Sequence, residues 1–208
     1  PTEADLARQY AAGRHSVRRA VAELAREGKL SVEQGRGTFV ESAPRLTYAI
    51  GKRTRRRQNL ASQVSDLGGE QLSHAVIPAP DKIAQTLQLE PGAPVSETRR
   101  LTLADGVPIA VGTAYRSETR FPGFAERRTV LGSVTEAYRS YGIEDYVRAE
   151  TTLHARQPRP EEAQRLKQHP GQPVIVVRAV DALPDGTPIA CSEVVWSAAR
   201  VKFTMGGD

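Results

Sequence analysis

The sequence is poor in cysteine and aromatic residues and contains no long apolar run. Its single cysteine, Cys191, excludes a disulfide within the chain, and no second thiol is present to complete a metal-binding spacing. A membrane-spanning helix would need about 18 consecutive apolar residues, and no such stretch exists. The start, Pro-Thr-Glu-Ala-Asp, lacks the basic and apolar regions of an export signal. We therefore expect a cytoplasmic protein with no membrane contact, metal or cofactor.

The composition is that of a folded protein. Apolar residues make up 39% of the 208 positions and charged residues 25%, which is enough for a buried core and excludes bulk disorder. This length predicts one small and one larger domain. The chain does not begin with Met, so we expect it to be a processed or truncated copy of a longer protein.

Positive charge is concentrated at the N-terminal end. Residues 1–45 carry eight basic and six acidic side chains, and residues 46–60 carry five basic side chains and no acid. The remaining 148 residues hold 16 basic and 18 acidic side chains. This asymmetry indicates an N-terminal module that faces a polyanion and a C-terminal module with another role. On charge alone, a solvated linker explains the basic run equally well.

The first 42 residues have the pattern of a small DNA-binding module. Thr2 and Asp5 predict a helix N-cap, and a second helix begins near Arg14 and ends before Gly28, which suits a left-handed C-cap. Two short β-rich runs follow, joined by the segment Gln34-Gly-Arg-Gly37. Helix, turn, helix and hairpin in this order predict a winged helix-turn-helix. The alternative is an ordinary helical hairpin with solvated arginines.

The larger module contains an internal repeat. Arg100-Leu-Thr-Leu-Ala-Asp-Gly-Val-Pro-Ile-Ala and Arg178-Ala-Val-Asp-Ala-Leu-Pro-Asp-Gly-Thr-Pro-Ile-Ala both read as a strand, an Asp-Gly turn and a second strand. A short helical segment and a Pro-Gly turn precede each of them. Sequential hairpins with helices predict an α+β fold with an antiparallel sheet.

Three separated N-terminal segments resemble the DNA-binding domain of the GntR family of transcription regulators. They are Pro1-Thr-Glu-Ala-Asp-Leu-Ala-Arg-Gln-Tyr, Arg14-His-Ser-Val-Arg-Arg-Ala-Val-Ala-Glu-Leu and Gln34-Gly-Arg-Gly-Thr-Phe-Val. The resemblance implies that the family's first helix is missing here. It also implies DNA contacts from the helix starts and from the hairpin tip, namely Thr2, Arg14, Ser16, Arg18, Gly35, Arg36 and Gly37.

The duplicated C-terminal module resembles the effector-binding (UTRA) domain of the HutC subfamily, which has a chorismate-lyase-like fold. The stretch Thr54-Arg-Arg-Arg-Gln-Asn-Leu is most similar to the phosphonate-utilisation (PhnF-like) regulators, and Tyr138-Arg-Ser-Tyr-Gly-Ile also matches. The resemblance implies a homodimer that binds operator DNA, with domains at residues 1–42 and 58–208 and a basic linker at 43–57.

Several residues are candidates for binding a small anionic effector. Arg55, Arg56 and Arg57 combine charge with the start of a predicted helix, which favours phosphate or carboxylate. By resemblance, Arg100 and Ser133 close the same pocket. Glu193 takes a polar role there if its side chain points inward. The alternative for the arginine run is linker charge that touches DNA or nothing.

The four histidines lie far apart in sequence, and Ser133 has no nearby general base, so no catalytic residue is predicted. Cys191 lies in an apolar strand and reads as a small buried side chain. We expect a ligand-responsive repressor. The alternatives are a small-molecule binding module without DNA binding and, third, a chorismate-lyase-like enzyme.

Overall fold

The computed structural model describes residues 2–33, 37–40, 45–53 and 59–206. Its N-terminal part, here called the head, contains helices α1 (Glu3–Gln9) and α2 (Arg14–Arg26) and the antiparallel strands β1 (Leu30–Glu33) and β2 (Gly37–Val40). The predicted cap is confirmed, because Thr2 and Asp5 bond reciprocally in a capping box. Helix, turn, helix and hairpin therefore form the expected winged helix-turn-helix.

Helix α2 ends as its sequence predicts. Gly28 follows it with a φ of +76°, a left-handed conformation that glycine adopts without strain. On the apolar side of α2, Val17 is buried and Val21 half-buried, whereas Leu24 remains 37% exposed.

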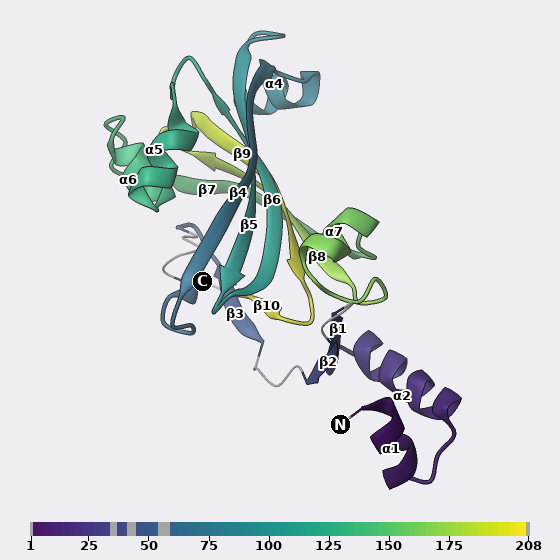
Figure 1. The fold of residues 1–208 in the computed structure, drawn as a ribbon. Helices are drawn as coiled ribbons and strands as arrows, with labels where there is room; N and C mark the ends of the chain where they lie inside the picture. Colours follow the sequence, from purple (N-terminus) through teal and green to yellow (C-terminus); the bar gives the residue numbers. More distant parts are fainter. Residues whose placement is uncertain (1, 34–36, 41–44, 54–58, 207–208) are drawn as a thin grey trace.

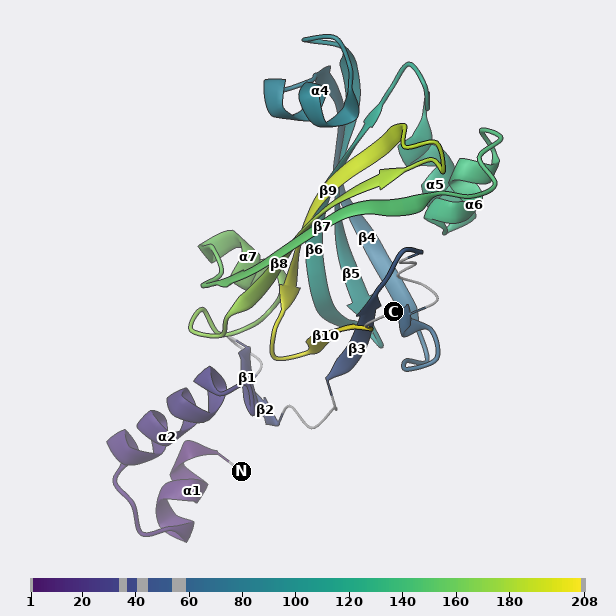
Figure 2. The ribbon, with the colours of Figure 1, turned by 180° about the vertical axis from the view of Figure 1, so that it is seen from behind.

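The remaining residues, here called the body, are built on one antiparallel sheet of six strands. Its spatial order is β4-β5-β6-β9-β8-β7, so the first three strands and the last three form two halves that meet at β6 and β9. Figures 1 and 2 show the strongly twisted sheet with the head beyond one end. The strands are β4 (Leu67–Pro78), β5 (Pro94–Ala104), β6 (Val107–Ser117), β7 (Val147–Arg156), β8 (Val174–Ala182) and β9 (Pro188–Ser197).

The two halves repeat each other, as predicted. Asp105-Gly106 and Asp185-Gly186 turn the hairpins β5–β6 and β8–β9, and both glycines have positive φ. A short helix precedes each hairpin, α4 (Asp81–Leu87) in the first half and α7 (Pro160–Arg165) in the second. Helix α4 contacts β9 and α7 contacts β6, so each helix covers strands of the other half.

The two faces of the sheet are covered differently. Helices α4 and α7 pack on one face through clusters that include Leu87 and Leu166. On the opposite face, helices α5 (Phe124–Leu131) and α6 (Val134–Arg139) cover one end through an aromatic cluster. A second cluster around Tyr48 and Trp196 covers the other end of that face. A cavity remains between these two clusters.

Part of the predicted linker is a strand of the body. Strand β3 (Leu46–Ile50) lies within residues 43–57 and pairs in parallel with β10 (Val201–Met205). The alternation Leu46, Tyr48, Ile50 gives β3 an apolar side that packs into the body, which stabilises it as a strand. The body therefore begins earlier than residue 58.

None of the helices in the described part of the chain combines the length and the apolar character that crossing a membrane requires.

Candidate ligand-binding and DNA-binding sites

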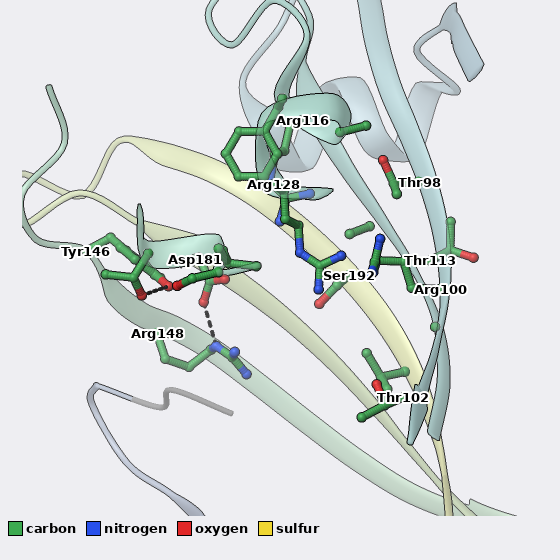
Figure 3. Close-up of a pocket in the computed structure, with 18 of the residues that line it drawn as sticks. Thr98, Arg100, Thr102, Thr113, Arg116, Arg128, Tyr146, Arg148, Asp181 and Ser192 are labelled. Atoms are coloured by element: carbon green, nitrogen blue, oxygen red, sulfur yellow. Dashed lines mark hydrogen bonds and ion pairs between the residues drawn. The ribbon is translucent and has the colours of Figure 1, made fainter. Parts of the chain in front are cut away.

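The cavity lies between the sheet and the α5–α6 pair, with a volume of about 200 Å³. Alternate residues of β5, β6 and β9 form its floor, since side chains at every second position leave the same face of a sheet. Helix α5 and the start of α6 form its roof, and β7 and β8 close one side (Figure 3). Its polar and charged lining residues are Tyr48, Thr98, Arg100, Thr102, Thr113, Arg116, Arg128, Ser133, Thr135, Tyr146, Arg148, Asp181 and Ser192.

Four arginines and a single carboxylate give the lining its charge. Arg100 comes from β5, Arg116 from β6, Arg128 from α5 and Arg148 from β7, whereas Asp181 is the one acid that lines the cavity. In Figure 3 the side chains of Arg100 and Arg128 point into the same space above Ser192. Arg100 donates to Gln71 Oε1 and to the Gly69 carbonyl, both at 3.4 Å, which is long for a hydrogen bond.

Arg116 is held rigidly at the aromatic end of the cavity. Only 7% of it is exposed, and its Nε donates to the Tyr138 hydroxyl at 2.9 Å. The guanidinium lies 4.3 Å from the centre of the Phe124 ring, which attracts it electrostatically. Burial raises the pKa of Tyr138 to about 12, so its hydroxyl stays neutral and does not cancel the charge of Arg116. Arg116 therefore contributes a fixed positive charge.

Hydroxyl groups and small residues complete the floor. Thr98 is 5% exposed, and its Oγ1 has no hydrogen-bond partner among the described residues. Across the strands Arg100 stands opposite Gly112, which in turn stands opposite Val194. A Cβ at Gly112 would lie 2.8 Å from Val194 Cγ2 and 3.0 Å from the Glu193 carbonyl, so only glycine fits beside Arg100.

The opposite side of the cavity is internally neutralised. Arg148 Nε donates to Asp181 Oδ1 at 2.7 Å, and both side chains are mostly buried. Tyr146 is 4% exposed, and its hydroxyl lies 3.3 Å from Thr135 Oγ1. Since this ion pair leaves no net charge, the positive potential of the cavity comes from Arg100, Arg116 and Arg128.

The structure brings some of the predicted effector residues together. Arg100 and Ser133 line the same cavity, and Ser133 is the N-cap of α6, accepting from the Glu136 amide at 3.3 Å. Glu193 points to the opposite face, where it pairs with Arg178 at 2.7 Å, so the condition for its polar role is not met. Its neighbour Ser192 faces the cavity instead. Arg55, Arg56 and Arg57 lie outside the described residues.

Sequence reasoning missed Arg116, Arg128 and Arg148. Arg116 lies on the same face of β6 as Gly112 and Ala114, but which face that is depends on a bulge in the β5–β6 hairpin, so alternation alone did not indicate it. Arg128 lies on a roof helix, and a bulge follows Arg148 in β7. No local pattern indicated either of these two.

Three of the predicted DNA-binding residues, Arg14, Ser16 and Arg18, lie in the first turns of α2. Arg14 and Ser16 are exposed, and Arg18 is exposed and pairs with Glu3 of α1 at 2.9 Å. Thr2 is occupied as the cap of α1, and Gly37 begins β2 with a φ of +117°. Gly35 and Arg36 lie outside the described residues.

One cluster in the body has the residue types of a hydrolase. His74 Nε2 lies 3.0 Å from Ser96 Oγ, and His74 Nδ1 lies 3.2 Å from Glu126 Oε1. Ser96 is 2% exposed and does not line the cavity, so no substrate reaches its hydroxyl. Glu126 is on α5 and His74 on β4, and the contact therefore fastens the roof of the cavity to the edge of the sheet.

The buried thiol and the described acidic residues offer no further chemistry. Burial raises the pKa of Cys191 to about 11, which keeps it a thiol at neutral pH. Within the described ranges, no group of three His, Cys, Asp or Glu side chains could hold a metal ion.

Comparison with known proteins agrees with this architecture. Residues 1–40 match the model of bacterial regulatory proteins of the gntR family, and residues 62–202 match that of the UTRA domain. An uncharacterized HTH-type transcriptional regulator of Rhizobium meliloti is 41% identical over 99% of this chain and 84% of its own length. The HTH-type transcriptional repressor PhnF of Mycolicibacterium smegmatis is 26% identical over 98% of this chain and 82% of its own length.

A crystal structure of PhnF from Mycobacterium smegmatis has a TM-score of 0.73 and 25% identity, covering 100% of this chain and 91% of that one. The UTRA model spans more than half of the chain, and the Rhizobium meliloti relative is similar over nearly all of it. The chain therefore belongs to the GntR family of transcription regulators, in the branch that carries a UTRA domain and includes the PhnF-type regulators.

Proposed function

We propose that the chain is a cytoplasmic DNA-binding repressor whose affinity for its operator changes when a small anion binds in the cavity of the body. The observation that carries this proposal is the lining of four arginines against one carboxylate. Guanidinium groups suit phosphate, phosphonate and carboxylate because they donate parallel hydrogen bonds to paired oxygens.

The chemistry of the cavity favours a compact, strongly anionic group. Arg100, Arg116 and Arg128 approach from the floor and the roof, so a tetrahedral group between them meets donors on several sides. The unpartnered Thr98 hydroxyl and the Ser192 hydroxyl add two short donors at the same end. In a partly closed cavity these interactions are stronger than at an exposed surface.

The size of the cavity limits the ligand. A volume of about 200 Å³ corresponds to on the order of seven water molecules. Inorganic phosphate, a short phosphonate or a compact sugar phosphate suits this space. The aromatic residues Tyr48 and Trp196 provide a wall for the uncharged part of such a ligand.

The head supplies the DNA-binding half of the proposal. The exposed side chains of Arg14 and Ser16 at the start of α2 suit contact with bases and phosphates in the major groove. In a homodimer two such helices would read half-sites about 34–36 Å apart. A ligand that binds one arrangement of the heads more tightly then changes operator affinity, and by linkage operator DNA changes the ligand's affinity by the same factor.

The experiment is an operator selection followed by a ligand screen. Random-sequence DNA duplexes are selected on the purified full-length protein, and the selected duplex is used in gel shifts with phosphate, phosphonates, sugar phosphates and carboxylates. Retardation that one of these anions changes supports the switch. Anion binding by a protein that retards no DNA supports a binding module instead. Turnover of any tested compound would contradict both readings.

A further inference from the structure

The end of the predicted recognition helix is docked on the body through a buried glutamine. Gln172, in the turn between α7 and β8, is 3% exposed, and its Nε2 donates to the carbonyl of Ala25, which is 0% exposed. The Gln172 carbonyl accepts in turn from Gln168 Nε2 at 2.9 Å, which fixes the turn. The head and the body are therefore joined by a directed hydrogen bond in addition to the chain itself.

A close backbone approach lies beside this bond. A Cβ placed on Gly28 would lie 3.0 Å from Cβ of Ala199, in the turn between β9 and β10. Any side chain at position 28 would push the end of α2 away from the body. Gly28 thus serves two purposes, since it ends the helix with positive φ and lets the head approach Ala199.

This contact is small and incompletely packed. A space of about 520 Å³ opens next to it, lined in part by Arg26, Arg45 and Lys202. Domains joined through a small contact are expected to move relative to each other unless the interface is large and apolar, so this junction suits a contact that opens and closes.

Strands β3 and β9, which carry Tyr48 and Trp196, connect the cavity to the docking contact. Tyr48 and Trp196 line the cavity, with ring centres 4.9 Å apart. Strand β9 ends at Ser197, one residue after Trp196, and the turn that follows carries Ala199, which lies beside Gly28. Strand β3 starts just after Arg45, whose Nε donates to the Ala199 carbonyl at 3.3 Å. A ligand that displaces either ring therefore acts on the residues that hold the head.

We propose that the Gln172–Ala25 hydrogen bond and the Gly28–Ala199 contact form a latch whose closure is coupled to occupancy of the arginine-lined cavity through Tyr48 and Trp196. The latch is a two-state element, docked or released, and anion binding shifts the balance between these states. This inference rests on the proposed function, because it requires an anion in that cavity.

The first test measures docking directly by hydrogen exchange at the amides of Glu27, Gly28 and Lys29 in the full-length protein. Gln172→Ala should speed exchange at these amides, whereas Gln164→Ala, an exposed position on α7, should not. Gly28→Ala should have the same effect, and adding Ala199→Gly should reverse much of it by removing the atom that the new methyl meets. Gly92→Ala controls for backbone strain, since Gly92 has a φ of +75° and open space around it.

The second test measures coupling by titrating inorganic phosphate into the same proteins and following the fluorescence of Trp196, the single tryptophan. Releasing the latch with Gln172→Ala or Gly28→Ala should change the midpoint for phosphate by about fivefold or more. Equal midpoints in the wild type and in both latch variants would overturn the latch while leaving the anion site intact. If the wild type binds neither phosphate nor any anion of the ligand screen, both proposals are overturned, whereas unchanged exchange in both variants would overturn the latch alone.

Discussion

At the scale of single residues, Arg99 and Arg100 allow the proposed role in anion binding to be tested apart from a role in stability. They are neighbours in β5, so their side chains leave opposite faces of the sheet. Arg100 lines the cavity, whereas Arg99 pairs with Glu161 of α7 at 2.7 Å. The chain thus provides a matched pair of arginines that differ only in the face they occupy.

Arg100→Ala should weaken anion binding about 10- to 100-fold and leave operator binding intact. The reason is that a hydrogen bond to a charged group contributes roughly 1.5–3 kcal/mol. Binding is followed by Trp196 fluorescence and operator affinity by gel shift. Arg99→Ala should bind the anion as the wild type does. Equal losses in the two variants would mean that Arg100 acts through folding of the sheet.

The single cysteine should react only when the protein unfolds. Burial raises the pKa of Cys191 to about 11, so the thiolate is scarce at pH 8, and the side chain is 7% exposed. A thiol reagent such as Ellman's should therefore label the native protein slowly at pH 8 and the guanidinium-unfolded protein at once. The native rate should rise with pH toward this pKa. Rapid native labelling at pH 8 would contradict the burial described above.

At the scale of secondary-structure elements, an ion pair fixes α7 to β7. Arg156 Nη1 and Nη2 donate to Glu162 at 2.6 and 2.7 Å, and the amide of Arg159 donates to the same carboxylate at 2.7 Å. Burial alone would raise the pKa of Glu162, but the hydrogen bonds from Arg156 and Arg159 outweigh it and leave the pKa below its usual value. The folded body therefore favours the charged form.

Glu162→Gln should destabilise the body by about 2 kcal/mol at pH 7, because Arg156 loses its charged partner. Since the pKa is lowered in the folded state, this stabilisation is present above the unfolded value of about 4.3 and is lost as the pH falls below it. Urea unfolding followed by Trp196 fluorescence should show the difference shrinking below about pH 4. Glu161→Gln, which is half-exposed, should cost less than about 0.5 kcal/mol. A difference that persists in acid would rule out the charge as its cause.

The hairpin β5–β6 shows why the cavity could be predicted only in part. The Asp-Gly turns and the repeated strands were visible in the sequence, and they fixed the two hairpins correctly. Counting back from the Asp105-Gly106 turn pairs Arg100 with Val111, which would place Arg116 on the opposite face. A bulge between Thr102 and Leu103 shifts the register and pairs Arg100 with Gly112 instead. That shift brings Arg116 into the cavity, and nothing local in the sequence announces it.

At the scale of the whole molecule, the proposed DNA-binding and anion-binding residues lie in different parts, the first in the head and the second in the body. Arg14→Ala should weaken operator binding about 10- to 100-fold and reduce the salt dependence, because one contact to a base or phosphate is lost. The anion concentration at half-saturation in the fluorescence titration should stay unchanged. Gel shifts at two salt concentrations and Trp196 fluorescence measure the two effects, with Arg165→Ala on the exposed side of α7 as a control. Loss of both activities would indicate misfolding and discredit the assignment.

The family and the order of the elements could be predicted from local motifs, since caps, glycine stops and turns depend on a few adjacent residues. The predicted linker was partly wrong because strand β3 is defined by its partner β10, some 150 residues away. The same holds for the docking of the head, where Gln172 and Ala25 meet through the fold of the body. Contacts between segments that are distant in the chain leave no local pattern, so a single sequence does not predict them.

Helices α4 and α7 connect the two halves of the body, because each packs on the half that it does not belong to. Each helix rests on strands of the opposite half, α4 on β9 and α7 on β6. Half of the body, produced as a separate polypeptide, would leave one side of its helix and one edge of its sheet uncovered. Two such polypeptides could cover both by exchanging helices across a twofold axis. In the intact chain each half thus supplies a helix that covers the other, so neither half is complete without its neighbour.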